Sequence, residues 1–184
     1  MKIGVRSESG EVDARAVELA QRLGLPYAHD NAEAEIILWV SGDEGFSLSL
    51  AQDSPNTRLH LSFHSGALNH RRMYGGGKSQ MIAKAVGIEK GVYPSIIDAT
   101  AGLGGDAFVL AALGATVFGV EKNPILFALL DDAKTRAREY AESNDPELSE
   151  VLKRLEFAQA DSCDYLASAK ESFPEVIYLD PMFP

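Results

Sequence analysis

From Tyr93 onward, short apolar segments of strand length alternate with segments of helical pattern. The strand-like segments cover residues 96–98, 116–120, 155–159 and 176–179. This order predicts parallel βαβ units, because parallel strands need a long crossover connection and a helix usually supplies it. We therefore expect an α/β fold with an open parallel sheet over residues 93–184.

The sequence also marks where the helices of this region begin and end. A helical pattern follows a glycine-rich turn and stops at Gly114. Asn123 is expected to cap a long second helix with Pro124 in its first turn, where the missing proline N–H is not needed. A further helix is expected over residues 162–170.

Residues 1–69 follow a different, mixed pattern. A strand is expected over residues 2–6 and an amphipathic helix over residues 11–23, followed by short strands over residues 35–40, 46–50 and 59–63. This predicts a small, partly antiparallel α/β region without recognisable chemistry. Residues 70–92 are expected to form a basic, glycine-containing connector and helix between the two regions.

The chain has 184 residues, one cysteine and a formal net charge of -10. Taken as a whole, this charge argues against a nucleic-acid partner, since phosphate binding relies on Lys and Arg. However, residues 70–90 hold 5 basic and 1 acidic residue, and the acidic excess lies on either side of them. No run approaches the roughly 18 consecutive apolar residues of a membrane span, so we expect a cytoplasmic protein.

The first strand of the predicted sheet ends at Asp98 and leads into a turn that contains Gly102, Gly104 and Gly105, followed by Asp106. Glycines at such a position let the backbone turn sharply and approach a ligand closely. The pattern predicts a cofactor-binding loop. The alternative is that the glycines only form a tight connection between strand and helix.

Glu121 ends the second strand, 23 residues after Asp98. In nucleotide-binding α/β folds an acid about 20 residues beyond the loop accepts hydrogen bonds from ribose hydroxyls. These two features fit a nicotinamide-binding fold as well as an S-adenosylmethionine (SAM)-binding fold, because Gly102-x-Gly104-x-x-Ala107 satisfies the dinucleotide pattern.

Asp180-Pro181-Met182-Phe183-Pro184 follows the last strand. Ligands of open α/β sheets lie outside the carboxyl ends of the strands. There the Asp180 carboxylate is suited to accept from an exocyclic amino group while Phe183 stacks on a planar base, a contact typically worth about 1–3 kcal/mol. Hydride transfer has no use for such a clamp, so the segment favours SAM chemistry.

Asp161 and Ser162 follow the third strand. One interpretation has Asp161 accepting from an adenine amino group and Ser162 capping the following helix. The alternative is that one member of the pair is purely a helix cap. The four histidines show no metal-ligand spacing with Cys163, so no metal is expected.

Four stretches carry a family resemblance: HRRMYGGGK, DATAGLGGDAFVLAALG, VEKNPILFALLDDA and IYLDPMFP. They resemble a family of bacterial methyltransferases that modify N2 of a guanine in 16S ribosomal RNA. The resemblance extends along the whole chain and is densest from His70 onward. The last stretch departs from the general Asp/Asn-Pro-Pro-aromatic pattern by Met182.

The resemblance implies a Rossmann-like class I methyltransferase fold, SAM as the methyl donor, and 16S ribosomal RNA or the small subunit as the partner. It implies cofactor contacts from Gly105, Asp106, Glu121, Lys122, Asp161, Ser162 and Asp180. Asp180 or the Pro181 carbonyl would hold the acceptor amino group, with Phe183 on the base. The basic stretch offers RNA contacts from His70, Arg71, Arg72 and Lys78, with a solvated surface as the alternative.

The sheet of a class I methyltransferase continues beyond the strand that carries the clamp, whereas four residues follow Asp180 here. We therefore expect a sheet truncated after its fourth strand, and a fragment with little activity alone. Three functions stay open at this point: an RNA guanine-N2 methyltransferase, a nicotinamide-dependent oxidoreductase, and a non-catalytic module that binds RNA or a protein.

Overall fold

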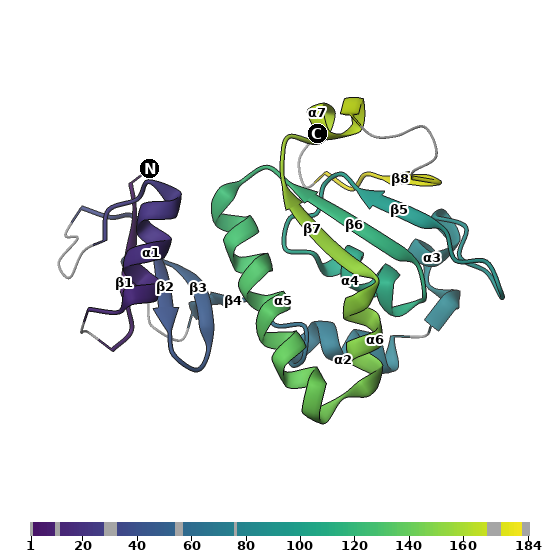
Figure 1. The fold of residues 1–184 in the computed structure, drawn as a ribbon, viewed down its shortest axis with the longest axis horizontal. Coiled ribbons are helices and arrows are strands. Elements are labelled where there is room, and N and C mark those ends of the chain that lie inside the picture. Colours follow the sequence, from purple (N-terminus) through teal and green to yellow (C-terminus); the bar gives the residue numbers. More distant parts are fainter. Residues whose placement is uncertain are drawn as a thin grey trace. The chain divides into compact units, whose positions relative to one another are not determined.

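The computed structural model of the chain describes residues 2–9, 12–27, 33–53, 57–75, 77–168 and 174–181. The chain divides into two units, Met1–Leu61 and Ser62–Pro184. The segment after Leu61 therefore belongs with the second unit, whereas the sequence placed the end of the first region at residue 69. Figure 1 labels the helices and strands of both units.

The first unit is a four-stranded sheet with one helix. Its elements are β1 (Ile3–Ser7), α1 (Ala14–Leu23), β2 (Ile36–Ser41), β3 (Gly45–Leu50) and β4 (Leu59–His60). The strand order is β1-β2-β3-β4, with β1 parallel to β2 and the other neighbours antiparallel. This confirms the expected partly antiparallel α/β region.

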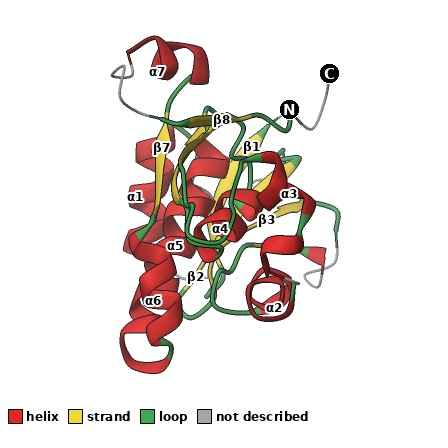
Figure 2. Ribbon diagram, turned by 90° about the vertical axis from the view of Figure 1, so that its right-hand side faces the viewer, coloured by secondary structure: helices red, strands yellow, loops and turns green. Residues whose placement is uncertain are grey.

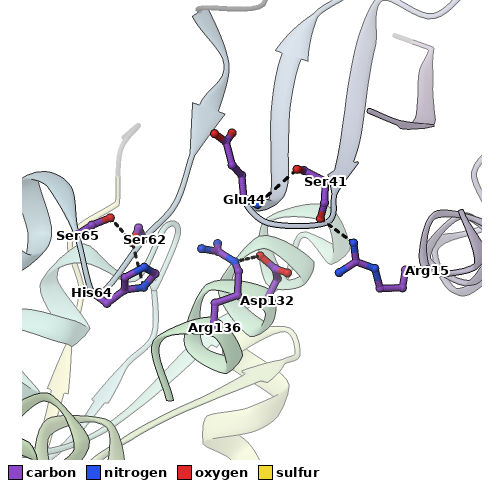
Figure 3. A network of polar contacts seen from close by, with 8 residues as sticks. All are labelled: Arg15, Ser41, Glu44, Ser62, His64, Ser65, Asp132 and Arg136. Carbon is purple, nitrogen blue, oxygen red and sulfur yellow. Dashed lines mark hydrogen bonds and ion pairs between the residues drawn. The ribbon is translucent and has the colours of Figure 1, made fainter. Parts of the chain in front are cut away.

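Local polar contacts fix the ends of elements in this unit. Asp13 caps α1 by accepting from the Arg15 amide at 2.8 Å, so the helix begins later than the sequence pattern suggested. Ser41 ends β2, and Figure 3 shows its carbonyl accepting from the Arg15 guanidinium at 2.7 Å. The Ser41 hydroxyl accepts from the Glu44 amide at 3.4 Å, which closes the turn before β3.

The second unit is built on a fully parallel sheet. Its elements after residue 94 are β5 (Ser95–Asp98), α4 (Gly105–Ala112), β6 (Thr116–Glu121), α5 (Pro124–Asn144), α6 (Pro146–Lys153), β7 (Leu155–Gln159), α7 (Ser162–Ser168) and β8 (Val176–Tyr178). The order is β7-β6-β5-β8, and every neighbouring pair is parallel. This is the Rossmann-like parallel sheet that was expected. The order in which the strands are added along the chain reverses between β5 and β8.

Helices cover both faces of this sheet (Figures 1 and 2). On one face α7 packs Tyr165 over Phe118, with ring centroids 5.1 Å apart. On the other face Phe157 of β7 packs against Gly119 of β6. At one side of the sheet β8 pairs only with β5 among the described strands, and its Ile177 side chain is 50% exposed.

The segment before the sheet forms α2 (Gly66–Tyr74), the short 3-10 helix η2 (Gly77–Ser79) and α3 (Met81–Ala85). The Ser62 hydroxyl contacts Ser65 Oγ at 2.8 Å and His64 Nδ1 at 3.4 Å at the start of α2 (Figure 3). Phe63 is fully buried and stacks on Phe108 of α4 at 4.9 Å. This packing explains why β4 ends at His60 instead of continuing to residue 63.

The helices α5 and α6 each begin at a polar side chain followed by proline. Asn123 caps α5 by accepting from the amides of Ile125 and Leu126, and Pro124 is its first residue, as expected. The helix α5 then ends before Asp145. The Asp145 side chain accepts from the Leu148 amide at 2.9 Å and so caps the start of α6. An aspartate followed by proline is the signal for this second start.

We predict that Gly119→Ala destabilises the second unit by about 1–3 kcal/mol. A Cβ at residue 119 would lie 2.5 Å from Phe157 Cδ1, and the Phe157 ring is held by stacking on Phe63. Urea denaturation measures the free energy of unfolding. The control is Gly42→Ala, where a Cβ meets no atom within 4 Å. Equal stability of the two variants would contradict the prediction and would show that the Phe157 ring moves aside at little cost in free energy.

Candidate active site

A pocket of about 650 Å³ opens at the carboxyl ends of β5, β6 and β8. Its position and size are typical of a small-molecule site in an open α/β sheet. The structure brings most of the residues predicted from the sequence to it. Those that line the pocket are Asp98, Gly102, Gly105, Asp106, Glu121, Lys122, Ser162, Asp180 and Pro181.

Glu121 connects the glycine-rich loop to the start of α5. Its Oε2 accepts from the Gly102 amide at 2.9 Å, and its Oε1 accepts from the Asn123 amide at 2.7 Å. Gly102 has a φ of 53°, a left-handed conformation that glycine adopts without strain. Each carboxylate oxygen keeps a further lone pair, so Glu121 can accept from ligand hydroxyls while it holds the loop.

Gly104 has a different task from the one that the sequence suggested. It does not belong to the residues that line the pocket. A Cβ at this position would lie 2.6 Å from Leu130 Cδ2 and 2.9 Å from Phe157 Cζ, and its φ is 70°. Gly104 therefore lets the loop pack closely on α5 and β7. Close packing against neighbouring elements is one of the roles that glycines have in such loops.

Asp98 is a buried carboxyl group at the end of β5, with only 2% of the residue exposed. It accepts from the Thr100 amide at 3.0 Å. Burial, reinforced by the negative charges of Asp106 and Asp180, raises the pKa of Asp98 from 3.8 to about 6. A carboxylate in this situation is stabilised by a positive ligand group.

Asp106, in the first turn of α4, receives two side-chain donors. Arg71 of α2 donates to Oδ1 at 3.2 Å, and the Tyr178 hydroxyl of β8 donates to Oδ2 at 2.9 Å. Burial and the bond to Asp106 raise the pKa of Tyr178, which keeps its hydroxyl protonated as a donor. Asp106 therefore ties together three elements beside the pocket.

Asp161, not Ser162, caps α7. Asp161 Oδ1 accepts from the Cys163 amide at 2.9 Å, and Oδ2 pairs with Lys122 Nζ at 2.8 Å. This ion pair lowers the pKa of Asp161 and raises that of Lys122. The expectation that Ser162 is the cap was wrong, because its hydroxyl donates to the Ala99 carbonyl instead.

The clamp segment is described only in part. Asp180 and Pro181 line the pocket, and the Asp180 amide donates to Thr100 Oγ1 at 2.8 Å. The expected stacking residue, Phe183, lies outside the described residues, as does Met182. That Asp180 holds the acceptor stays a prediction.

The arginines of the basic stretch, residues 70–90, are less available for contacts with RNA than the charge of the stretch suggests. Arg71 is bonded to Asp106, and Arg72 forms an ion pair with Asp145 in which the Arg72 side chain is only 7% exposed. His70 is exposed, and its ring lies 4.9 Å from that of Tyr74. The Lys78 side chain lies outside the described part of the structure.

Thr100 and Tyr178 are pocket residues that the sequence analysis did not identify. Thr100 follows Asp98 by two residues, and an aspartate side chain that accepts from the amide two residues on is a recognisable turn signal. Tyr178 lies in an otherwise apolar strand and carries no comparable signal.

No group of three or more His, Cys, Asp or Glu side chains is placed to hold a metal ion within the described ranges. Among the helices that the structure describes, none combines the length and apolar character needed to cross a bilayer.

We predict that Asp98→Asn makes the chain more stable than wild type at about pH 8, by roughly 1–3 kcal/mol. The folded-state pKa of Asp98 is raised, so its contribution to stability is fully present below pH 3.8 and is lost as the pH rises through about 6. Urea denaturation at about pH 5 and about pH 8 measures this difference. Asp131→Asn, at an exposed site on α5, is the control. A stability difference between Asp98→Asn and wild type that does not grow with pH would contradict the prediction.

Comparison with known proteins assigns the chain to a family. Residues 18–184 match the family described as "Putative SAM-dependent methyltransferase". Ribosomal RNA small subunit methyltransferase J of Cellvibrio japonicus is 44% identical over 182 residues, which cover 96% of this chain and 68% of that protein. The protein of the same name from Pseudomonas syringae pv. tomato is also 44% identical, over 98% of this chain and 65% of its own length. The chain thus spans about two thirds of the length of these relatives.

A solved structure agrees with this assignment. The crystal structure of a SAM-dependent methyltransferase from Neisseria gonorrhoeae matches with a TM-score of 0.74 and 31% identity, covering 98% of this chain and 70% of that one. The findings decide against the nicotinamide alternative and make SAM the cofactor. The chain belongs to the family of SAM-dependent methyltransferases.

Proposed function

We propose that the chain transfers a methyl group from SAM to N2 of a guanine in 16S ribosomal RNA. The observation that carries the proposal is the position of Asp180, which follows β8 and lines the same pocket as the glycine-rich loop and Glu121. The names of the relatives, ribosomal RNA small subunit methyltransferase J, support the substrate class. A location in the cytoplasm follows from that substrate.

The residues of the pocket fit the cofactor. SAM carries a sulfonium and an ammonium group, and Asp98, Asp106 and Asp180 line the pocket as carboxyl groups. Burial disfavours the charged form of Asp98, so a cation placed nearby offsets this cost. Glu121 is the candidate acceptor for the ribose hydroxyls. Ser162 and Lys122 also line the pocket and are candidate contacts for the adenine ring.

The acceptor nitrogen of guanine is a weak nucleophile, because its lone pair is delocalised into the ring. SAM supplies an electrophilic methyl group when bound. The Asp180 carboxylate, or the Pro181 carbonyl, accepts an N2 hydrogen and turns the nitrogen toward that methyl group. As the N–C bond forms and the S–C bond breaks, N2 loses a proton, for which Asp180 is the nearest proposed acceptor. Orientation of two reactants alone can contribute a large part of such a rate enhancement.

The RNA contacts are proposed on the exposed side of α2. His70 and Tyr74 are exposed rings on neighbouring turns, so they are suited to meet an unstacked base. Arg71 pairs with Asp106 and Arg72 with Asp145, so the two arginines connect α2 to α4 and to the start of α6. Lys78 remains a proposed contact to the phosphate backbone of the RNA. The reaction as proposed uses no metal.

We predict that Glu121→Ala weakens SAM binding by about 10- to 100-fold, because a carboxylate that holds two amides and accepts from the ribose is lost. Glu121→Gln keeps one acceptor oxygen and should have an intermediate effect. Calorimetric titration with SAM measures both, and NADH should not bind. If Glu121→Ala binds SAM as tightly as wild type, Glu121 has no part in the cofactor site.

We predict that Asp180→Ala, made in a full-length version of the protein, lowers methyl transfer to small-subunit RNA by at least about 100-fold at saturating SAM. The physical reason is that the N2 amino group loses its acceptor. The measurement is mass-spectrometric detection of N2-methylguanine under single-turnover conditions, with naked and partly assembled RNA. Asp131→Asn is the matched control and should keep wild-type activity. Retained transfer by Asp180→Ala would remove Asp180 from this role.

A further inference from the structure

The main-chain hydrogen-bond ladder between β5 and β8 ends at the edge of the pocket, where the next amide and carbonyl bond to side chains instead of to each other. Ala99 N still donates to the Tyr178 carbonyl at 3.0 Å, in register with the pairing of Asp98 and Tyr178. In a parallel ladder the next hydrogen bond would run from Asp180 N back to the Ala99 carbonyl. Instead, Asp180 N donates to Thr100 Oγ1 at 2.8 Å, and the Ala99 carbonyl accepts from Ser162 Oγ.

Two hydroxyl groups therefore satisfy the donor and the acceptor of the replaced ladder bond. This matters because a backbone amide or carbonyl without a partner costs free energy comparable to a lost hydrogen bond. With both groups satisfied, the strands can separate after Ala99 without that cost. The separation lies between β5 and β8, where the order of the strands reverses and where the pocket opens.

The direction of the hydrogen bonds at Thr100 is fixed by chemistry. A backbone amide only donates, so the Thr100 oxygen accepts from Asp180 and its own hydrogen is available for another acceptor. Asp98 Oδ1 lies 3.5 Å from Thr100 Oγ1 and also accepts from Thr100 N at 3.0 Å. Thr100 thus connects a buried carboxyl group to the main chain of Asp180. Its β-branched side chain has few accessible rotamers, which favours one position of the hydroxyl.

We propose that Thr100 is a positioning residue for methyl transfer, whose hydroxyl group holds the Asp180 main chain apart from β5 and thereby directs the Asp180 carboxylate into the pocket. The proposal rests on the proposed function, since it assumes that Asp180 holds the acceptor. Ser162 has the complementary role, because it satisfies the Ala99 carbonyl that Asp180 leaves.

The test compares Thr100→Val with Thr100→Ser in a full-length version of the protein. Valine keeps the shape of the side chain and removes the hydroxyl, whereas serine keeps the hydroxyl and removes the methyl group. We expect Thr100→Val to lower kcat by about 10- to 100-fold while the Kd for SAM changes by less than about threefold. We expect Thr100→Ser to stay within about threefold of wild type in both. Thr100→Ala replaces the valine variant if that variant does not fold.

A second measurement does not depend on RNA or on turnover. Hydrogen–deuterium exchange of the Asp180 amide should be at least about threefold faster in Thr100→Val than in wild type, and close to wild type in Thr100→Ser. Wild-type exchange or wild-type kcat in the valine variant would overturn the proposal, as would an equal loss in the serine variant. If a full-length version of the protein binds SAM but methylates no RNA, the proposed function fails, and the exchange measurement alone decides the role of Thr100.

Discussion

The pocket depends on the Glu121 carboxylate, which accepts from two backbone amides on different loops. Parallel strands bring their carboxyl ends to one edge of a sheet, but they do not fix the loops that follow. Glu121 does so by joining the turn after β5 to the start of α5. A charged acceptor makes stronger hydrogen bonds than a neutral one, so one side chain is enough to set the shape of this edge.

The acidic character of the pocket has a cost in the fold and a use in binding. Asp98 is buried near the carboxyl groups of Asp106 and Asp180, and both the burial and the like charges oppose its ionisation. Asp106 reduces part of this repulsion by pairing with Arg71 and Tyr178. A site arranged in this way binds a cationic ligand with a gain that a neutral ligand does not provide.

The sequence predicted the sheet and its helices well, because strand length, glycine turns and the Asn123-Pro124 start are local signals. It also led to Glu121 and Asp180, which line the pocket, because each follows directly after an apolar stretch of strand length. It failed where the partner is distant in the chain. No local pattern shows that Arg72 pairs with Asp145, that Gly104 packs on Leu130, or that Ser162 bonds to Ala99. Those partners are set by how the helices cross the sheet.

The strand β8 combines two properties that act on the protein in solution. Among the described strands it pairs only with β5, and Ile177 and Leu179 beside it are 50% and 62% exposed. The outer side of a strand that exposes apolar side chains is a surface to which another extended segment can add. An extended segment that bound to this side of β8 would lie next to Asp180 and would compete with binding of the proposed acceptor.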